Sequence, residues 1–146
     1  MFYIVERKVP GINGHLIDIV GCFTLIPLKQ VALTGLDEGV LEGGAQLTAA
    51  HITKRRKTAK ALYIGVLVGA DAMASGMVLR ELVKKINACC LKSGIIKVFG
   101  RPITEDGLRL MQKHKFTTVP AFGEGTPQMN IVCCKHWKSS ETRQYN

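Results

Sequence analysis

The sequence has few aromatic residues, few acidic residues and no long apolar run. Phe, Tyr and Trp make up 6% of its 146 residues, and 11 Asp and Glu stand against 20 Lys and Arg. A membrane-spanning helix needs about 20 mostly apolar residues in a row, and polar or charged residues interrupt every such stretch here. The aromatics are also not interleaved with basic residues, as they are in single-strand binding platforms. We therefore expect no membrane span and no base-stacking surface.

Several catalytic and metal-binding motifs are also missing from the sequence. There is no Gly-x-Ser-x-Gly, no Walker loop and no His-Glu-x-x-His. The five cysteines include the adjacent pairs Cys89-Cys90 and Cys133-Cys134, and their odd number and irregular spacing argue against a disulfide-stapled secreted scaffold. The N-terminal segment places apolar residues before charges, the reverse of a signal peptide. We expect a cytoplasmic protein without a metal site.

The composition that remains is that of a folded, basic protein. Hydrophobic residues make up 47% of the chain and charged residues 21%, which predicts one globular domain over residues 1–134 and a polar tail over 135–146. The net charge of +9 favours anionic partners, such as nucleic acid, an anionic membrane surface or a phosphate-bearing cofactor. Composition alone does not choose among these partners.

The first quarter of the chain predicts two antiparallel strands. Residues 2–8 alternate in polarity as a strand does, and the segment 10–14 contains the Pro and Gly residues of a turn. Residues 16–27 are apolar and β-branched, with a bulge or bend expected at Gly21.

The rest of the chain predicts an α/β fold, in which a mixed, mainly antiparallel sheet carries helices on its faces. Residues 61–70 form a nearly continuous apolar run, typical of a central strand that is buried on both faces. Residues 35–60 predict one or two short helices joined by loop. The further expected elements are helices over 77–92 and 104–114, and strands over 95–100, 116–119 and 129–134.

A stretch of small residues lies between the predicted central strand and the helix that follows it. Asp71-Ala-Met-Ala-Ser-Gly76 would let an anion approach the backbone N–H groups at the positive end of the helix dipole. The same residues would equally serve as a tight connection between a strand and a helix. The loop alone leaves both interpretations open.

The order of elements from Leu62 to Val119 resembles the GNAT-type N-acetyltransferase superfamily over about two-fifths of the chain. The similarity rests on Tyr63-Ile-Gly-Val-Leu-Val68, the small-residue loop and the helix after it, Ile95-Ile-Lys-Val-Phe99, and Asp106-Gly-Leu-Arg-Leu-Met-Gln-Lys-His-Lys-Phe116. Gly21-Cys-Phe-Thr-Leu-Ile26 likewise resembles the family's third strand. In this family the central strand leads into a Q/R-x-x-G-x-G/A loop that holds the pyrophosphate of acyl-CoA.

The resemblance implies that the chain binds acetyl-CoA as an acyl donor and transfers the acetyl group to an amine that the sequence does not identify. In the family reaction the amine attacks the thioester directly, while main-chain N–H groups of the central strand polarise its carbonyl. The cofactor-binding residues that the resemblance implies are Val66, Val68, Ala72, Ala74, Ser75, Gly76 and Met77.

The sequence departs from the family pattern at three positions and at its beginning. Asp71 stands where the family has Gln or Arg, Ala74 replaces the middle Gly, and Met111 replaces the Tyr that often acts as general acid. The family's first strand and first two helices have no counterpart here. No catalytic residue is therefore assigned: we expect Tyr63 to be a core aromatic and His114 a solvated residue at a helix end. A non-catalytic domain with the same fold is an alternative function.

A second alternative comes from the densest basic cluster, Lys54, Arg55, Arg56 and Lys57, with Lys60 nearby. Such a cluster can bind a nucleic-acid backbone without recognising its bases. It can equally be a solvated loop.

Overall fold

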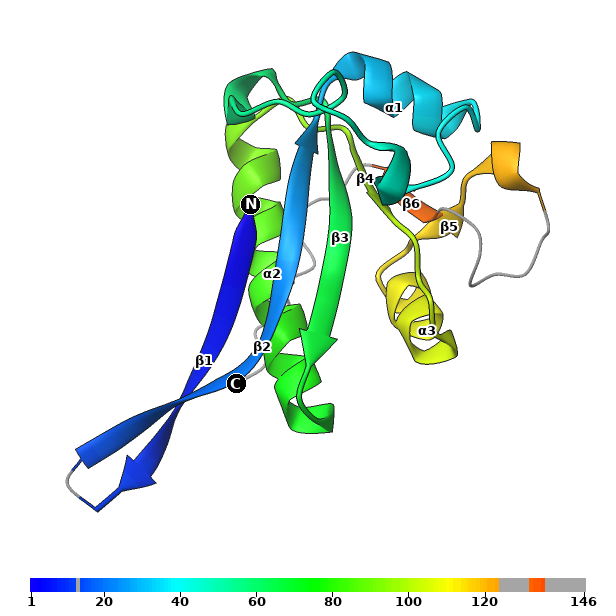
Figure 1. Ribbon diagram of the computed structural model, residues 1–146. Coiled ribbons are helices and arrows are strands. Elements are labelled where there is room, and N and C mark those ends of the chain that lie inside the picture. The colour runs from blue at the N-terminus through cyan, green and yellow to red at the C-terminus, as the bar shows by residue number, and fades with distance from the viewer. Residues whose placement is uncertain (13, 124–131, 136–146) are drawn as a thin grey trace.

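The computed structural model describes residues 1–12, 14–123 and 132–135 (Figure 1). Its elements follow the predicted order of strands and helices. They are β1 (Phe2–Gly11), β2 (Gly14–Leu28), α1 (Gln30–Asp37), β3 (Ala61–Gly69), α2 (Ala72–Lys92), β4 (Lys97–Gly100), α3 (Glu105–Lys113), β5 (Thr117–Thr118) and β6 (Val132–Lys135), with 3-10 turns at Gly44–Gln46, Arg56–Thr58 and Pro120–Phe122.

The six strands form one sheet in the order β1-β2-β3-β4-β6-β5. Every neighbouring pair is antiparallel except β3 and β4, which α2 connects as parallel strands. The predicted fold class, a mixed and mainly antiparallel sheet with helices on its faces, is confirmed. No helix among the described residues is long and apolar enough to cross a membrane.

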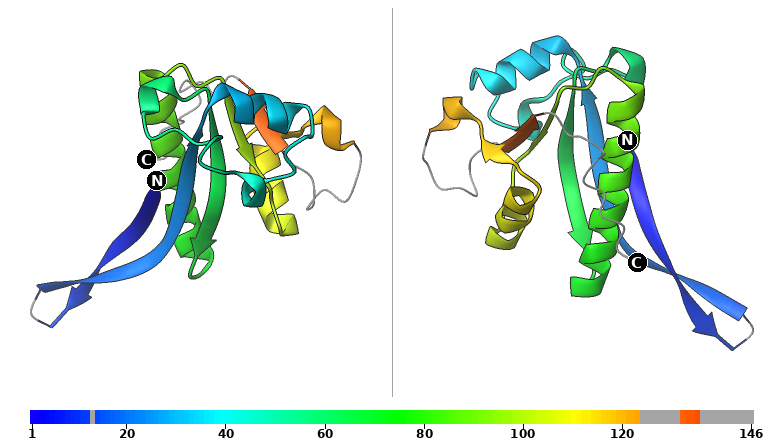
Figure 2. Two further views of the ribbon diagram at one scale, coloured as in Figure 1. Left: turned by 45° about the horizontal axis from the view of Figure 1, so that its top comes forward. Right: turned by 180° about the vertical axis from the view of Figure 1, so that it is seen from behind.

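Strands β1 and β2 form a long hairpin whose outer end projects from the rest of the molecule as an arm (Figures 1 and 2). The predicted bend near Gly21 is confirmed as a bulge, because Val5 pairs with Gly21 whereas Glu6 pairs with Ile19, which leaves Val20 as the extra residue. A side chain at Gly21 would overlap the carbonyl oxygen of Val68 on β3. Glycine is therefore required here by the close approach of β3.

Strand β3 lies inside the sheet, as predicted for residues 61–70, but only its first half is buried. Residues Ala61 to Ile64 are buried, whereas Gly65 to Gly69 are half-buried or exposed. The prediction of a strand buried on both faces is wrong for the second half. The apolar run reflects strand propensity along its whole length, but among the described residues both faces are covered only over the first half, and α2 alone covers the second half.

Helix α2 covers one face of the sheet (Figure 2, right). Its inward side buries Ala74, Val78, Leu82, Ile86 and Cys89 at helical spacing against side chains of β2 and β3. The helix ends before Ser93, as predicted, but it begins at Ala72 rather than near Gly76. The small-residue loop that the sequence predicted is therefore the first turn and a half of the helix.

Helix α1 and the segment after it cover the upper part of the opposite face (Figure 1). Leu33, Leu36 and Leu41 pack there with Tyr63 and Phe99, and Lys97 on β4 forms an ion pair with Asp37. The short helical pieces predicted for 35–60 are present, although α1 begins earlier, at Gln30.

The C-terminal part follows the prediction where it is described. Thr104 caps α3 by accepting a hydrogen bond from the N–H of Gly107 at 3.0 Å. Strand β5 falls within the predicted 116–119, and β6 overlaps the predicted 129–134. Lys135, the first residue of the predicted tail, belongs to β6, while residues 129–131 and 136–146 lie outside the described residues.

Candidate functional site

The two parallel strands at the middle of the sheet stay paired over only four residues each. Pairing runs from Ala61 with Lys97 to Ile64 with Gly100, where β4 ends, while β3 continues to Gly69. On the side that faces β4, the second half of β3 is therefore not paired with β4. We call the residues from Gly65 to Gly69 on this side the open edge.

The hydrogen bonds to β2 show which N–H groups of β3 face the open edge. The N–H of Ala70 donates to the carbonyl oxygen of Val20 at 2.9 Å, and the N–H of Val66 donates to Thr24 Oγ1 at 2.8 Å, both on β2. Because N–H groups alternate between the two edges of a strand, the N–H of Val68 also faces β2. The N–H of Leu67 faces the open edge.

A bulge in β3 makes this arrangement possible. Phe23 pairs with Leu67 and Leu25 with Ile64, so that Gly65 and Val66 together stand opposite Thr24. A Cβ on Gly65 would come within 2.5 Å of Thr24 Oγ1. Thr24 is a residue that the sequence did not single out, because nothing in the sequence shows which hydroxyl faces a bulge.

The two predicted valines of the cofactor site have exposed side chains, but their N–H groups face β2. On the neighbouring side, Met111 of α3 packs against Gly100, where a side chain would overlap its terminal methyl group. Met111, predicted at the position of a general acid, therefore fills the space beside the last pair of β3 and β4. A thioether has no proton to donate there.

The helix N-terminus next to the open edge is capped by its own chain. Asp71 Oδ1 accepts a hydrogen bond from the N–H of Ala74 at 2.7 Å, and the carbonyl oxygen of Asp71 accepts one from Ser75. The carboxylate thus occupies the position where an anion would contact the third N–H of the helix. The N–H groups of Ala72 and Met73 are the other donors of this first turn.

The remaining predicted cofactor residues occupy different places on α2. Ala74 is buried against the sheet, and Ser75 lies on Gly69, where a Cβ would come within 2.5 Å of the Ser75 nitrogen. Gly76 is exposed and has open space around it, and Met77 packs at the margin of the core. The structure therefore brings Ala72, Ala74 and Ser75 together at the helix start, and it sets Gly76 and Met77 one turn further on.

An arginine from the arm lies next to this helix start. Arg7 on β1 contacts Met73 through Nη1, at 3.8 Å from the sulfur, and forms an ion pair with Asp18 Oδ2 at 2.7 Å through Nη2. Its Nε is buried without a hydrogen-bond partner. The sequence gives no sign of this role for Arg7, because 66 residues separate it from Met73 and only the folded hairpin brings the two together.

The two ionisable side chains considered for catalysis have structural surroundings. Tyr63 is buried, as predicted for a core aromatic, and burial raises its pKa above the ordinary value even though a hydrogen bond from the Gly44 backbone and the charge of Arg101 act in the opposite direction. His114 is the C-cap of α3, the predicted helix end, and is half-buried. Burial, together with the charge of Lys113, lowers its pKa. Neither lies on the open edge.

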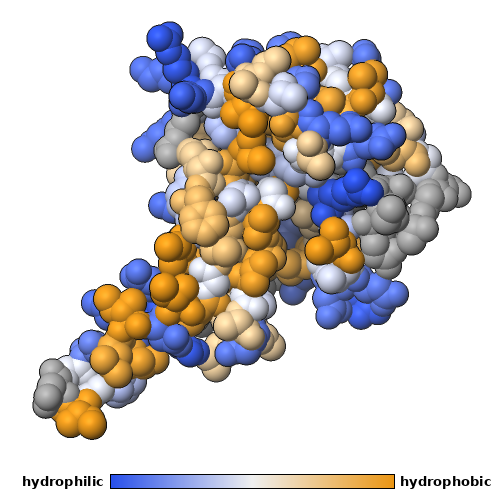
Figure 3. Space-filling view, in the orientation of Figure 1, coloured by the Kyte–Doolittle hydropathy of each residue, from blue (hydrophilic) through white to orange (hydrophobic). Residues whose placement is uncertain are grey.

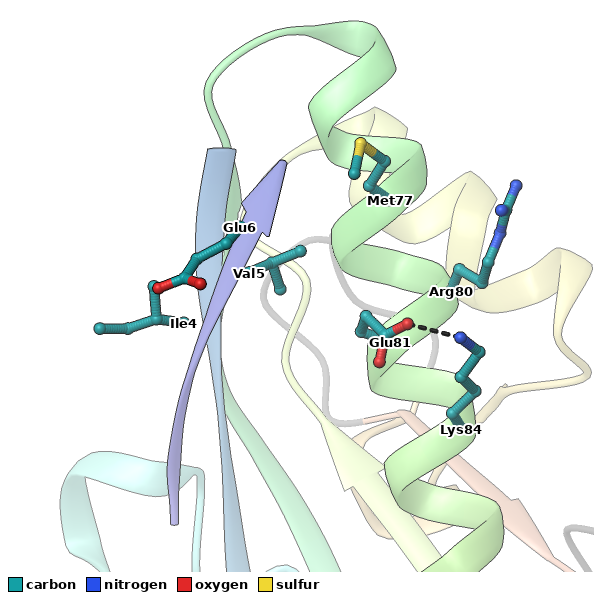
Figure 4. A pocket seen from close by; sticks show the side chains of 7 residues that line it. All are labelled: Ile4, Val5, Glu6, Met77, Arg80, Glu81 and Lys84. Atoms are coloured by element: carbon teal, nitrogen blue, oxygen red, sulfur yellow. Dashed lines mark hydrogen bonds and ion pairs between the residues drawn. The ribbon is translucent and has the colours of Figure 1, made fainter. Parts of the chain in front are cut away.

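A groove and the basic cluster lie away from the open edge. A groove of about 280 Å³ lies between the edge strand β1 and α2 (Figure 4), on the far side of β2 from the open edge, and is lined by Ile4, Val5, Glu6, Met77, Arg80, Glu81 and Lys84. In the basic cluster, Lys54, Arg55 and Lys57 are exposed next to the 3-10 turn, while the side chain of Arg56 lies outside the described residues. Within the described ranges, no three His, Cys, Asp or Glu residues gather as metal ligands.

Comparisons with known proteins give one distant likeness. No family model matches the chain, and no curated protein matches it. A crystal structure described as that of a "putative acetyltransferase" from Agrobacterium tumefaciens is similar, with 13% sequence identity and a TM-score of 0.44, over 90% of this chain and 72% of that chain. A likeness of this strength does not establish a ligand or a reaction.

Proposed function

We propose that the chain binds acyl-CoA at the open edge of β3 and transfers its acetyl group to an amine. The observation that carries the proposal is the separation of β3 from β4 after Ile64 and Gly100, which leaves the Leu67 N–H facing outward next to a helix N-terminus. A pantetheine arm is an extended chain of amides that can pair with such an edge, and a pyrophosphate suits the N–H groups of Ala72 and Met73. Arg7 would add positive charge beside the phosphates.

The chemistry expected at this edge is direct transfer. The amine nitrogen attacks the thioester carbonyl carbon, a C–N bond forms, the C–S bond breaks, and CoA leaves as a thiolate that takes up a proton while the amine loses one. The Leu67 N–H would stabilise the charge that develops on the carbonyl oxygen. The Val66 N–H is not available for this role, because it is bonded to Thr24.

Two observations favour the non-catalytic alternative. The Asp71 carboxylate already caps the helix start, and it would repel a pyrophosphate placed there. Met111 supplies no acid beside the open edge. A domain with this fold that has no turnover is therefore the second candidate function.

The test is a titration of CoA and acetyl-CoA by calorimetry and thermal shift, since a ligand that binds the folded state raises the melting temperature. Asp71→Asn should tighten binding by roughly tenfold or more, because it removes a like charge directly beside the proposed phosphates, with less effect at high salt. Asn keeps the helix cap. Gly76→Asp should weaken binding by placing a charge near the phosphates, whereas Gly76→Ala should not.

The matched control is Asp106→Asn, which removes the same charge from the exposed first turn of α3. It should leave CoA affinity unchanged. Binding without release of free thiol, in the presence of a panel of amines, would favour the non-catalytic alternative. No heat and no thermal shift at millimolar CoA and low salt would overturn the proposal of acyl-CoA binding.

A further inference from the structure

The sheet face opposite α2 is covered in its upper part by α1 but has no covering element in its lower part within the described residues. Six large apolar side chains from three strands lie exposed on this lower part. We call it the bare face: Phe2 and Ile4 on β1, Ile17 and Ile19 on β2, and Val66 and Val68 on β3.

The pairing registers place these side chains on one side of the sheet. Ile4 stands opposite Cys22, which in turn stands opposite Val68. Glu6 stands opposite Ile19 in the same way, and directly paired residues of antiparallel strands project to the same face. Figure 4 shows Ile4 and Glu6 pointing away from α2 while Val5 points toward it. Figure 3 shows the apolar surface running from the body onto the arm.

We propose that the bare face is a homodimer interface, through which two copies of this chain pack face to face. Soluble monomers rarely expose contiguous apolar patches larger than a few hundred Å². Two strands of about eight residues and the second half of β3, from Gly65 to Gly69, give a footprint on the order of 300 Å² in projection, at about 4.8 Å between strands and about 3.3 Å per residue. A footprint of this size is below the ~800 Å² that a standard interface buries on each partner, so we expect a weak, reversible dimer.

The charges on this face favour a second copy over an anionic partner. The charged residues of β1 that project to it are Glu6 and Lys8, which have opposite signs, so this face is close to neutral although the chain carries +9. A nucleic acid or an anionic membrane surface would select a basic face instead. A two-fold axis through the face can set Glu6 of one copy near Lys8 of the other.

The shape of the bare face also matches a second sheet. It is broad over the body, where three strands contribute to it. It continues along the arm, which consists of β1 and β2 alone. A single helix is about 10–12 Å wide and would leave part of this surface uncovered. Two such sheets can instead stack about 10 Å apart with their apolar side chains interdigitated, as in a β-sandwich.

The test is sedimentation velocity over a range of protein concentrations, with the whole chain and at two salt concentrations. We expect a monomer–dimer equilibrium that tightens as salt rises, because both copies are positively charged and salt screens their repulsion. Ile19→Lys and Ile4→Lys should each weaken dimerisation by tenfold or more without unfolding the chain, because both side chains are already exposed. Leu91→Lys, at an exposed position on α2, is the matched control and should leave the dimer intact.

A second readout uses the cysteine on this face. Cys22 is half-buried between Ile4 and Val68, and its labelling by N-ethylmaleimide, located by peptide mass mapping, should slow as the dimer forms. A wild-type chain that stays monomeric at every concentration overturns the proposal. So does a dimer that both bare-face variants, shown to be folded by circular dichroism, leave unchanged. CoA binding is measured separately on the same variants, so failure of one proposal is distinguishable from failure of the other.

Discussion

The two halves of β3 are built from similar residues but have different surroundings. In the first half, Leu62 and Tyr63 are buried between α2 on one face and α1 on the other, and β4 pairs alongside. In the second half, Val66 and Val68 remain exposed, and pairing with β4 has ended. The comparison shows how one strand can anchor a core at one end and leave backbone and side chains uncovered at the other.

The largest effect should come from truncating equivalent apolar side chains in the two halves. Leu62 is 0% exposed and Val68 is 54% exposed. Leu62→Ala should lower the free energy of unfolding by about 2–5 kcal/mol, since it opens a cavity, whereas Val68→Ala should change it by at most ~0.5 kcal/mol in the monomer. Urea unfolding at low protein concentration measures both. Similar losses for the two variants would contradict the division of the strand.

A smaller effect is expected at the bulge where the two halves meet. Gly65→Ala should cost about 1–3 kcal/mol, because the new methyl group meets Thr24 Oγ1 at 2.5 Å. Thr24→Ala removes that obstacle but also removes the acceptor of the Val66 N–H, and alone should cost about 1 kcal/mol. Because one contact links the two sites, the double variant should be more stable than the sum of the single losses predicts. Additive losses in urea unfolding would show that the contact is not tight.

The smallest effect concerns α3, whose Met111 lies beside the last pair of β3 and β4. Burial lowers the pKa of His114 in the folded protein, so the unfolded chain takes up this proton at a higher pH than the folded one. Stability from His114 is present above about pH 6.5 and is lost as the pH falls through the folded pKa. The melting temperature of the wild type should therefore fall more between neutral and mildly acidic pH than that of His114→Gln. If the melting temperatures of the two proteins fell equally with pH, His114 would make no such contribution to stability.

Local patterns in the sequence were enough to predict most of the elements. The alternation of residues 2–8, the helical spacing from Val78 to Ile86 and the Thr104 cap each depend on contacts within a few residues. The predicted start of α2 lies about a turn too late, because Gly76 disfavours a helix interior in the sequence pattern. Gly76 costs a helix interior only about 1 kcal/mol, and the Asp71 cap fixes the boundary upstream of it.

The sequence by itself determined which segments form strands and helices and which faces of the helices are apolar, because these features follow from local periodicity and capping. Only the tertiary structure decided that β3 leaves β4 after Ile64, that the Val66 N–H is bonded to Thr24 while the Leu67 N–H faces outward, and that Arg7 reaches α2. The physical reason is register: strand pairing over long sequence separations sets which N–H faces which edge, and a one-residue bulge changes that direction.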